Sequence, residues 1–520
     1  MVNIYGFKTF QLKKTKGLKF FSEDSIHFLR EIGMRNSRYR YRTSLTANPD
    51  STMKNLRGIG LILLFNLCFL PAAAQVKGKV VDRANHRPVE FANVLIEGTS
   101  AGVVANAEGE FELFIPENRR GKNIIISRIG YKTNTLYAPS PDQNVLVTLA
   151  QQPVELAEVI VKPLDPLDIL KQAVRKIPEN YPAEPAYLYA YYREMVETNG
   201  IFVKYADAAC QLYSCAYTTP FDERKASSAY FKFDFLHWDK NKPFPQAKNT
   251  VPHQDDAVQV LAVRKSNDLE KFTNRWDFEE NLKKFDISGG PLHVTAADLV
   301  KLRKDVVDPS TWEYYLFKLV AVMKDGKKNT YKISFKPKKN RENALWEGVV
   351  YIDEESSAFM EFKYAVSEKG KKFLREKHYE QTVDLNPKMK RQLNRASVKR
   401  VVEQTGQNVQ VSYSRLHNKW YLSYIRIVNE FENSGDVFEK IIYHTYLDLY
   451  INDIQNRQVH RFPEENRFPT GYFSYLYHYP FPYDPGFWKK YNTPVPTELY
   501  KKAVKDLEKN KPLQEQFQKN

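Results

Sequence analysis

The chain lacks the short motifs that mark many enzymes. It contains no P-loop and no G-x-G-x-x-G, so no Gly-rich phosphate-binding turn is predicted. None of its ten histidines stands in an H-x-x-E or H-E-x-x-H pair, the spacing that zinc peptidases require. The nearest approach is His253 with Asp256, which we interpret as a chance pair in a polar loop. The sequence therefore predicts no metal site, no cofactor and no identifiable catalytic residues, and it favours a protein that is not an enzyme.

Cysteine is scarce, with three in 520 residues. Cys68 follows Phe65-Asn66-Leu67, which lacks the small residue that a lipoprotein signal places next to its cysteine, so we predict no lipid anchor. Cys210 and Cys215 lie in a strand-like stretch, and their odd spacing puts them on opposite faces of one strand. A disulfide would need a turn between them. We predict two buried free thiols.

Charge of one sign is not concentrated in any long block. The whole chain carries +16, but its first 74 residues hold 12 of the 78 Lys and Arg and 4 of the 62 Asp and Glu. The 446 residues from Gln75 onward therefore carry 66 basic and 58 acidic side chains, a net charge of +8. This modest, well mixed excess is not the footprint of a nucleic-acid-binding protein, and no nucleic-acid partner is predicted.

One apolar segment near the N-terminus indicates export. Met53-Lys54 and Arg57 form a short positive head, and the apolar run from Gly58 to Pro71 is too short to span a bilayer. Ala72-Ala73-Ala74 is typical of a signal-peptide cleavage site. We predict a signal peptide at 53–74 and a mature chain starting at Gln75, in the periplasm or associated with the outer membrane. Residues 1–52 are then interpreted as a disordered extension from a mis-assigned start.

Residues 75–150 have the pattern of a small antiparallel β-sandwich. Short runs rich in Val, Ile and Phe alternate with Gly, Pro and Asn turns about every ten residues. Gly98, Gly109 and Gly130 stand where tight turns would need a positive φ.

Several spaced motifs in this region resemble the carboxypeptidase regulatory-like domain. They are Gly78-Lys79-Val80-Val81-Asp82, Pro88 to Val94, Gly98-Thr99, Gly102, Glu108-Gly109-Glu110-Phe111 and Ile129-Gly130-Tyr131. The resemblance implies a transthyretin-like sandwich of seven or eight strands, common on secreted and outer-membrane proteins of Bacteroidetes. It also implies a non-catalytic module, because the family carries no catalytic residues of its own.

A linker at 151–165 leads to a second, β-rich α+β domain at 166–460. Here we predict a helix at 168–177, a short polar helix at 260–269 and a final helix at 497–509. Short turns, including 404–407 and 433–435, force antiparallel neighbours. The predicted strands are 187–195, 201–217, 314–323, 330–335, 346–352, 358–366, 396–403, 409–415, 420–431 and 438–449.

Successive hairpins with bulky aromatics predict a large curved antiparallel sheet. The hairpin that begins Gly348-Val349-Val350 is similar to those of half-barrel periplasmic lipoprotein carriers. The whole arrangement resembles uncharacterised Bacteroidetes envelope proteins that carry the regulatory-like domain. The fold class is thus mainly β: a sandwich followed by a half-barrel-like sheet.

Candidate binding residues come from two places. Arg193 and Glu194 form an ion pair at a cavity mouth or, as the commoner alternative, alternate between the two faces of one strand. Tyr475, Tyr477 and Trp488 belong to the aromatic and Pro-rich segment at 461–520, which is either a ligand platform or a lid over a sheet edge, followed by a C-terminal helix.

The sequence thus favours a secreted envelope protein that binds or scaffolds, with outer-membrane or envelope proteins as partners and an apolar or glycan ligand as a further option. Two alternatives remain open. One is an envelope hydrolase whose acids, such as Asp207, Glu194 or Asp353, converge in the fold. The other is a structural partner of an outer-membrane complex.

Overall fold

The computed structural model describes residues 74–139, 144–156, 164–222, 253–266, 290–325, 328–338, 345–373, 401–435, 438–468, 476 and 481–518. The predicted signal peptide and the extension before it lie outside this part, apart from Ala74. No helix of the described part is both long and apolar enough to cross a membrane.

The N-terminal module is a sandwich of two sheets with its own core. One sheet has the order β4-β1-β7 and the other β3-β2-β5-β6, which gives seven described strands. Gly98, Gly109 and Gly130 have φ of 70°, 74° and 86°, as predicted. The strands are β1 (Ala74–Asp82), β2 (Asn93–Ile96), β3 (Gly102–Val104), β4 (Glu110–Ile115), β5 (Ile124–Ser127), β6 (Asn134–Leu136) and β7 (Asn144–Leu149).

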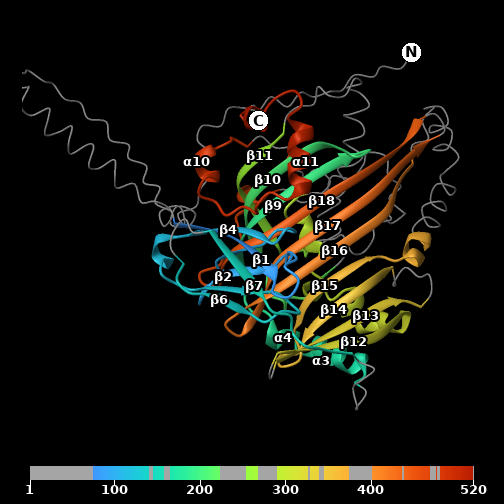
Figure 1. The fold of residues 1–520 in the computed structure, drawn as a ribbon. Coiled ribbons are helices and arrows are strands. Elements are labelled where there is room, and N and C mark those ends of the chain that lie inside the picture. The colour runs from blue at the N-terminus through green and yellow to red at the C-terminus, as the bar shows by residue number, and fades with distance from the viewer. Residues whose placement is uncertain are drawn as a thin grey trace, which may run out of the picture. The chain divides into compact units, whose positions relative to one another are not determined.

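The second module is an open 11-stranded antiparallel sheet (Figure 1). Its order is β11-β10-β9-β18-β17-β16-β15-β14-β13-β12-β8, so β9 and β18, far apart in sequence, are neighbours. The prediction of a mainly β chain, with a sandwich followed by a large antiparallel sheet, is confirmed. The strands are β8 (Val154–Leu156), β9 (Ala186–Thr198), β10 (Ile201–Ser214), β11 (Ala257–Lys265), β12 (Tyr315–Asp325), β13 (Lys328–Pro337), β14 (Trp346–Asp353), β15 (Phe359–Val366), β16 (Val401–Leu416), β17 (Lys419–Gly435) and β18 (Phe438–Gln455).

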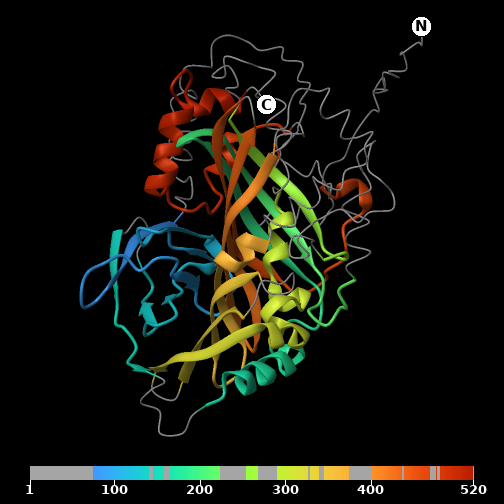
Figure 2. The same cartoon turned by 90° about the vertical axis from the view of Figure 1, so that its right-hand side faces the viewer.

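Both faces of this sheet are covered (Figure 2). One face packs against helices and 3₁₀ turns between the strands, which form the largest hydrophobic core. The other face holds the sandwich and the C-terminal helices. Consequently Ala186 to Glu197 of β9 are all buried. The helices and turns are α3 (Pro166–Arg175), α4 (Ile177–Asn180), η5 (His293–Ala297), α7 (Leu299–Leu302), η6 (Asp305–Val307), η7 (Pro309–Tyr314), α10 (Pro485–Trp488), α11 (Glu498–Leu507) and α12 (Leu513–Phe517).

The C-terminal segment holds the sandwich to the sheet. Asn492 Oδ1 accepts a hydrogen bond of 2.8 Å from the backbone N–H of Phe114 in β4. The backbone carbonyl of the same residue accepts one of 2.9 Å from Asn452 Nδ2 in β18. One residue of the tail therefore bonds both modules at once.

Two local predictions are wrong. Residues 260–269 were predicted as a helix, but Ala257–Lys265 form strand β11 along β10. The β-branched Val258, Val260 and Val263 suit a strand, and the long neighbour β10 supplies the ladder that an isolated segment lacks. Residues 404–407 were predicted as a turn between two strands. They are a bulge inside the single strand β16, at a register shift between Gln404 and Gly406 against β17. The boundary between β17 and β18 is also shifted by a few residues, since 433–435, predicted as a turn, are the last residues of β17, and β18 begins at Phe438.

Gly348 is predicted to be indispensable for the pairing of β14 with β15. A Cβ at this position would lie 2.2 Å from the backbone carbonyl oxygen of Lys363, and a backbone cannot move aside cheaply. We expect Gly348→Ala to lower the free energy of unfolding by about 3 kcal/mol, the upper end of overpacking costs, measured by urea denaturation. The matched control is Gly406→Ala, where a Cβ meets Glu430 Cβ at 3.4 Å, an ordinary contact. Equal losses for the two variants would contradict the prediction.

Candidate functional site

A row of alternating charges crosses five strands of the large sheet. Arg264 of β11 pairs with Asp207 of β10, which pairs with Arg193 of β9. Arg193 in turn pairs with Asp448 of β18, and Asp448 with Arg426 of β17. Directly opposite residues of an antiparallel ladder project from the same face. Each carboxylate of the row therefore stands between two guanidinium groups.

Asp207, the second member of this row, is fully buried. Its carboxylate accepts from Arg264 Nε at 2.7 Å and from Arg193 Nε at 3.2 Å. The hydroxyl groups of Tyr191 and Tyr205 also donate to it. Burial alone would raise the pKa of Asp207, but the two arginines and two tyrosines together hold it below its usual range. The group is an ionised anchor with its acceptor capacity already used.

Aromatic rings of the C-terminal helices cover the two arginines. The Arg264 guanidinium lies 4.5 Å from the ring centroid of Trp488 in α10. The Arg193 guanidinium lies 4.5 Å from that of Tyr500 in α11. Cation–π contacts of desolvated arginines are worth about 2 kcal/mol each. The tail is thus fixed on the sheet by the charges beneath it.

The predicted binding residues divide between the two faces of the sheet. Arg193 and Trp488 both belong to the cluster around Asp207, where Arg193 pairs with Asp207 and Trp488 packs on Arg264. Glu194 points to the opposite face, where it accepts from the Tyr192 hydroxyl at 2.9 Å and from the backbone N–H of Gly290 at 3.4 Å. Tyr475 and Tyr477 lie outside the described residues.

The three candidate acids do not converge. Asp207 and Glu194 lie on opposite faces, and Asp353 accepts from the backbone N–H of Ser356 at 3.0 Å, in the turn after β14.

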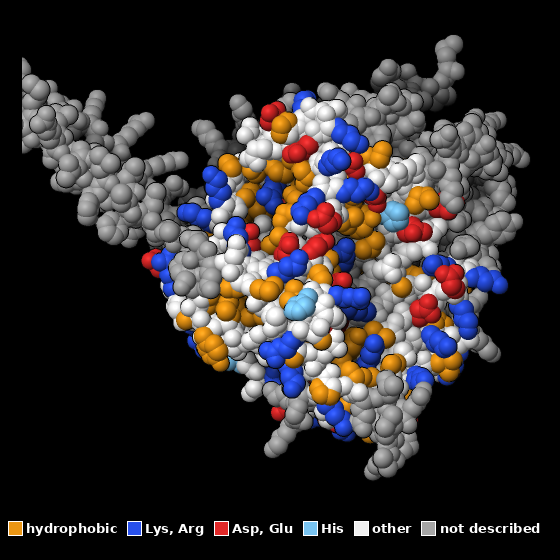
Figure 3. All heavy atoms as spheres, viewed as in Figure 1, with side chains coloured by type: hydrophobic (Ala, Val, Ile, Leu, Met, Phe, Trp, Pro, Cys, Tyr) orange, Lys and Arg blue, Asp and Glu red, His pale blue; other side chains and the backbone are white. Residues whose placement is uncertain are grey.

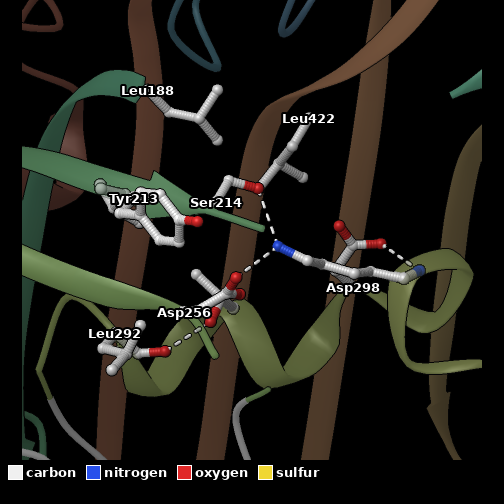
Figure 4. A pocket seen from close by; sticks show the side chains of 10 residues that line it. Leu188, Tyr213, Ser214, Asp256, Leu292, Asp298 and Leu422 are labelled. Atoms are coloured by element: carbon white, nitrogen blue, oxygen red, sulfur yellow. Dashed lines mark hydrogen bonds and ion pairs between the residues drawn. The ribbon is translucent and has the colours of Figure 1, made fainter. Parts of the chain in front are cut away.

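A second polar cluster lies where β10 ends and β11 begins (Figure 4). Lys301 of α7 donates to Asp256 Oδ1 at 2.6 Å and to Ser214 Oγ at 2.8 Å. Nearby, Asp298 accepts from the hydroxyl groups of Tyr217 and Tyr413, each at 2.6 Å. The small cavity beside these groups has a volume of about 10 Å³, room for a single water molecule. A substrate does not fit there.

The charge state of Lys301 argues against a serine–lysine catalytic pair in this cluster. A serine beside a lysine can form a nucleophile–base pair, but only if the lysine is neutral. Burial would lower the pKa of Lys301, yet the adjacent Asp256 carboxylate raises it above its ordinary value. Lys301 is therefore a fixed cation and cannot take the proton of Ser214. Burial raises the pKa of Asp298, opposed by the two tyrosine hydroxyls.

Three side chains beside Lys301 have metal-ligand chemistry. Cys215 Sγ, His253 Nδ1 and one Asp256 oxygen all lie within 4.8 Å of one another, and all three residues are buried. Cys215 and Cys210 are free thiols, as predicted. Burial raises the pKa of the Cys215 thiol to about 12 and lowers that of His253. His253 with Asp256 was interpreted as a chance pair in a polar loop. The third member, Cys215, stands 38 residues before His253, so no local spacing indicated it.

One sequence pattern that resembles a catalytic motif was overlooked. Residues 98–102 read Gly-Thr-Ser-Ala-Gly, which fits G-x-S-x-G. A nucleophile elbow needs a strand, a sharp turn and a helix. Here the segment joins β2 to β3 of the sandwich, and Ser100 Oγ hydrogen-bonds Asp453 of β18. The serine side chain therefore forms a hydrogen bond between the sandwich and the large sheet.

Comparison with protein families confirms the recognised domain. Residues 76–161 match the model of the CarboxypepD_reg-like domain, which extends beyond the predicted boundary at 150. The chain therefore contains such a domain. Residues 307–420 match a second model, a family of unknown function (DUF5686), which spans η7 to the start of β17. No curated protein matches the chain.

The solved structures that match this chain share little sequence with it and have low TM-scores. A DUF1329 family protein from Desulfovibrio piger ATCC 29098 is 11% identical, with a TM-score of 0.22, over 57% of this chain and 95% of its own. A putative membrane-associated protein of unknown function from Bacteroides fragilis NCTC 9343 is 10% identical, with a TM-score of 0.13, over 74% and 97%. Lipovitellin is 7% identical, with a TM-score of 0.18, over 54% and 26%.

Asp207→Asn is predicted to destabilise the protein strongly. It leaves Arg193 and Arg264 buried without their counter-charge, a situation that costs about 3–5 kcal/mol for buried pairs; we expect about 3, because Arg264 is partly solvated. Urea denaturation at pH 7 measures the loss. Asp168→Asn is the control, since Asp168 pairs with Lys171 on the exposed surface of α3 and should behave as exposed pairs do.

The same variant gives the sign of the pH dependence. The pKa of Asp207 is lower in the folded than in the unfolded chain, so its contribution is complete above the unfolded value of about 4 and is lost as pH falls through the folded value. The difference in the free energy of unfolding between wild type and Asp207→Asn should therefore become smaller as the pH falls below about 4. A gap that stays constant there would contradict the assignment.

Proposed function

We propose that this is an exported envelope protein that acts as a rigid binding scaffold, with the regulatory-like sandwich as a fixed adaptor. The single observation that carries the proposal is a buried ion pair between the two modules. Arg128 Nη1 after β5 of the sandwich lies 2.5 Å from Glu361 Oε2 on β15 of the sheet, and their side chains are 10% and 1% exposed.

The environment of Glu361 is built around this contact. Its carboxylate also accepts from Ser412 Oγ at 2.8 Å and from Gln410 Nε2 at 3.2 Å. Burial would raise the pKa of Glu361, but Arg128 and Lys363 hold it below its usual range. Buried charges need their partners at a fixed place, so this pair specifies one orientation of the sandwich. A module on a flexible tether would not need it.

Two further contacts between the modules support the same fixed arrangement. Phe91 of the sandwich stacks on Tyr424 of β17, with ring centroids 5.3 Å apart. Arg119 donates to Asp453 of β18 at 2.9 Å.

A scaffold with an outward-facing adaptor suits binding of an envelope partner. Figure 3 shows basic and acidic side chains interspersed on this face, a surface suited to protein contacts rather than to nucleic acid.

Ligand binding is the second candidate. Trp488 was predicted either to face an apolar or glycan ligand or to pack as part of a lid over a sheet edge, and a tryptophan ring suits both kinds of ligand. In the folded chain it is 7% exposed and packs on Arg264 and Tyr191. A ligand would therefore have to displace α10, which makes this function secondary to scaffolding.

Arg128→Met is predicted to loosen the two modules. The change leaves Glu361 buried without its main counter-charge, and removing one partner of a buried pair costs about 3–5 kcal/mol. The double variant Arg128→Met, Glu361→Met removes both charges and should recover most of the loss in urea denaturation. Lys79→Met is the control, because Lys79 pairs with Glu110 on the exposed surface of the sandwich. No recovery in the double variant would count against an orienting role.

Export and partner binding are tested in the organism that encodes the chain. We expect tagged protein to fractionate with the envelope, to begin at Gln75 and to retain an envelope protein in native mass spectrometry. The Arg128→Met variant should lose that protein if the fixed adaptor is required, whereas Lys79→Met should keep it. Intact chain in the cytosol would refute export, and purified mature chain without any bound protein would refute scaffolding.

A further inference from the structure

We propose that Cys215, His253 and Asp256 form a zinc-binding site where β10 ends and β11 begins. The site is independent of the scaffolding function. Cys215 directly follows β10, while His253 and Asp256 directly precede β11. Pairing of the two strands thus brings together ligands that are remote in sequence.

The spacing of the ligand atoms suits tetrahedral zinc. Zinc binds cysteine sulfur at about 2.3 Å and histidine nitrogen at about 2.0 Å, so sulfur and nitrogen on one ion stand about 3.5 Å apart. Cys215 Sγ and His253 Nδ1 are 3.4 Å apart. The Asp256 oxygen completes a triangle with no side above 4.8 Å. A tetrahedral ion would set all three sides at about 3.5 Å or less, so its binding would draw the Asp256 oxygen closer to the other two atoms.

Groups around the triad orient it as outer ligands of zinc sites commonly do. His253 Nε2 lies 3.4 Å from the carbonyl oxygen of Thr219, which assigns the ring hydrogen to Nε2. Nδ1 lies 3.4 Å from Cys215 Sγ and accepts a hydrogen bond of 3.2 Å from the backbone N–H of Asp255, which a bound zinc ion would replace. Asp256 Oδ1 accepts from the backbone N–H of Cys215 at 2.9 Å and from Lys301 at 2.6 Å. Ligating carboxylates are likewise held by hydrogen bonds.

The charge balance is acceptable. Binding of Zn²⁺ releases the thiol proton of Cys215 to solvent, so the ion meets one thiolate and one carboxylate and the three-ligand site is neutral. Lys301 adds one positive charge beside it, and its ammonium group lies 2.6 Å from the Asp256 carboxylate. Three protein ligands leave the fourth position for water.

The test uses the full chain, purified without chelators. Metal analysis should find one zinc ion per chain, and cobalt added to the metal-free protein should give the thiolate-to-cobalt charge-transfer band of a cysteine ligand. Cys215→Ser should abolish that band, and both Cys215→Ser and His253→Gln should weaken zinc binding at least 100-fold. Cys210→Ser is the matched control, a second buried free thiol without neighbouring ligands, and should bind as wild type does.

The outcomes separate the site from a simple S–H···N hydrogen bond. Wild-type protein without stoichiometric zinc and without the cobalt band would overturn the proposal. So would zinc binding that survives Cys215→Ser unchanged, since the ion would then lie elsewhere. If the variants do not fold, the charge-transfer band of the wild type and its persistence in Cys210→Ser decide the question alone. Failure here leaves the scaffolding proposal intact, because the Arg128 contact does not involve these residues.

Discussion

The structure depends on burying charges in the middle of a sheet. The row from Arg264 to Arg426 crosses five strands, and its members are covered by the sandwich and the C-terminal helices. Isolated ions in such a place would cost several kcal/mol each, so the register that sets each carboxylate between two guanidinium groups is essential. A slip of one residue in any strand would send these charges to the apolar face. The row therefore fixes the pairing of β9, β10, β11, β17 and β18.

The burial of both faces of the large sheet also explains why the chain is rich in tyrosine. A sheet exposed on one side would alternate apolar and polar residues, whereas β9 reads AYLYAYYREMVET and is buried on both sides. Tyrosine meets this demand because its ring fills space while its hydroxyl can serve a buried carboxylate. Tyr191 and Tyr205 serve Asp207, and Tyr217 and Tyr413 serve Asp298. The 33 tyrosines of the chain are thus partly a consequence of its buried acids.

Sequence reasoning succeeded where local signals were sufficient. Regular turns and β-branched runs predicted the sandwich, and most strands of the large sheet followed from the same patterns. It failed where a distant partner decides the outcome. Residues 257–265 become a strand because β10 lies beside them, and Gly406 marks a bulge because β17 continues past it. Arg193 and Glu194 could be assigned to opposite faces, but nothing local indicated that Asp207 and Arg264 would flank Arg193.

The two polar clusters differ in what their charges allow. Every acceptor site of the Asp207 carboxylate is occupied by a donor from an arginine or a tyrosine. The Asp256 carboxylate keeps the neighbouring Lys301 in its protonated form. Each group is stabilised in the state that makes it inert, which is the opposite of what acid–base catalysis demands. The neutral thiol of Cys215 and the neutral ring of His253 are different, because Sγ and Nδ1 lie 3.4 Å apart and within 4.8 Å of an Asp256 oxygen. In the described part of this chain, the proposed metal site at Cys215, His253 and Asp256 is therefore the cluster suited to hold an ion rather than to transfer a proton.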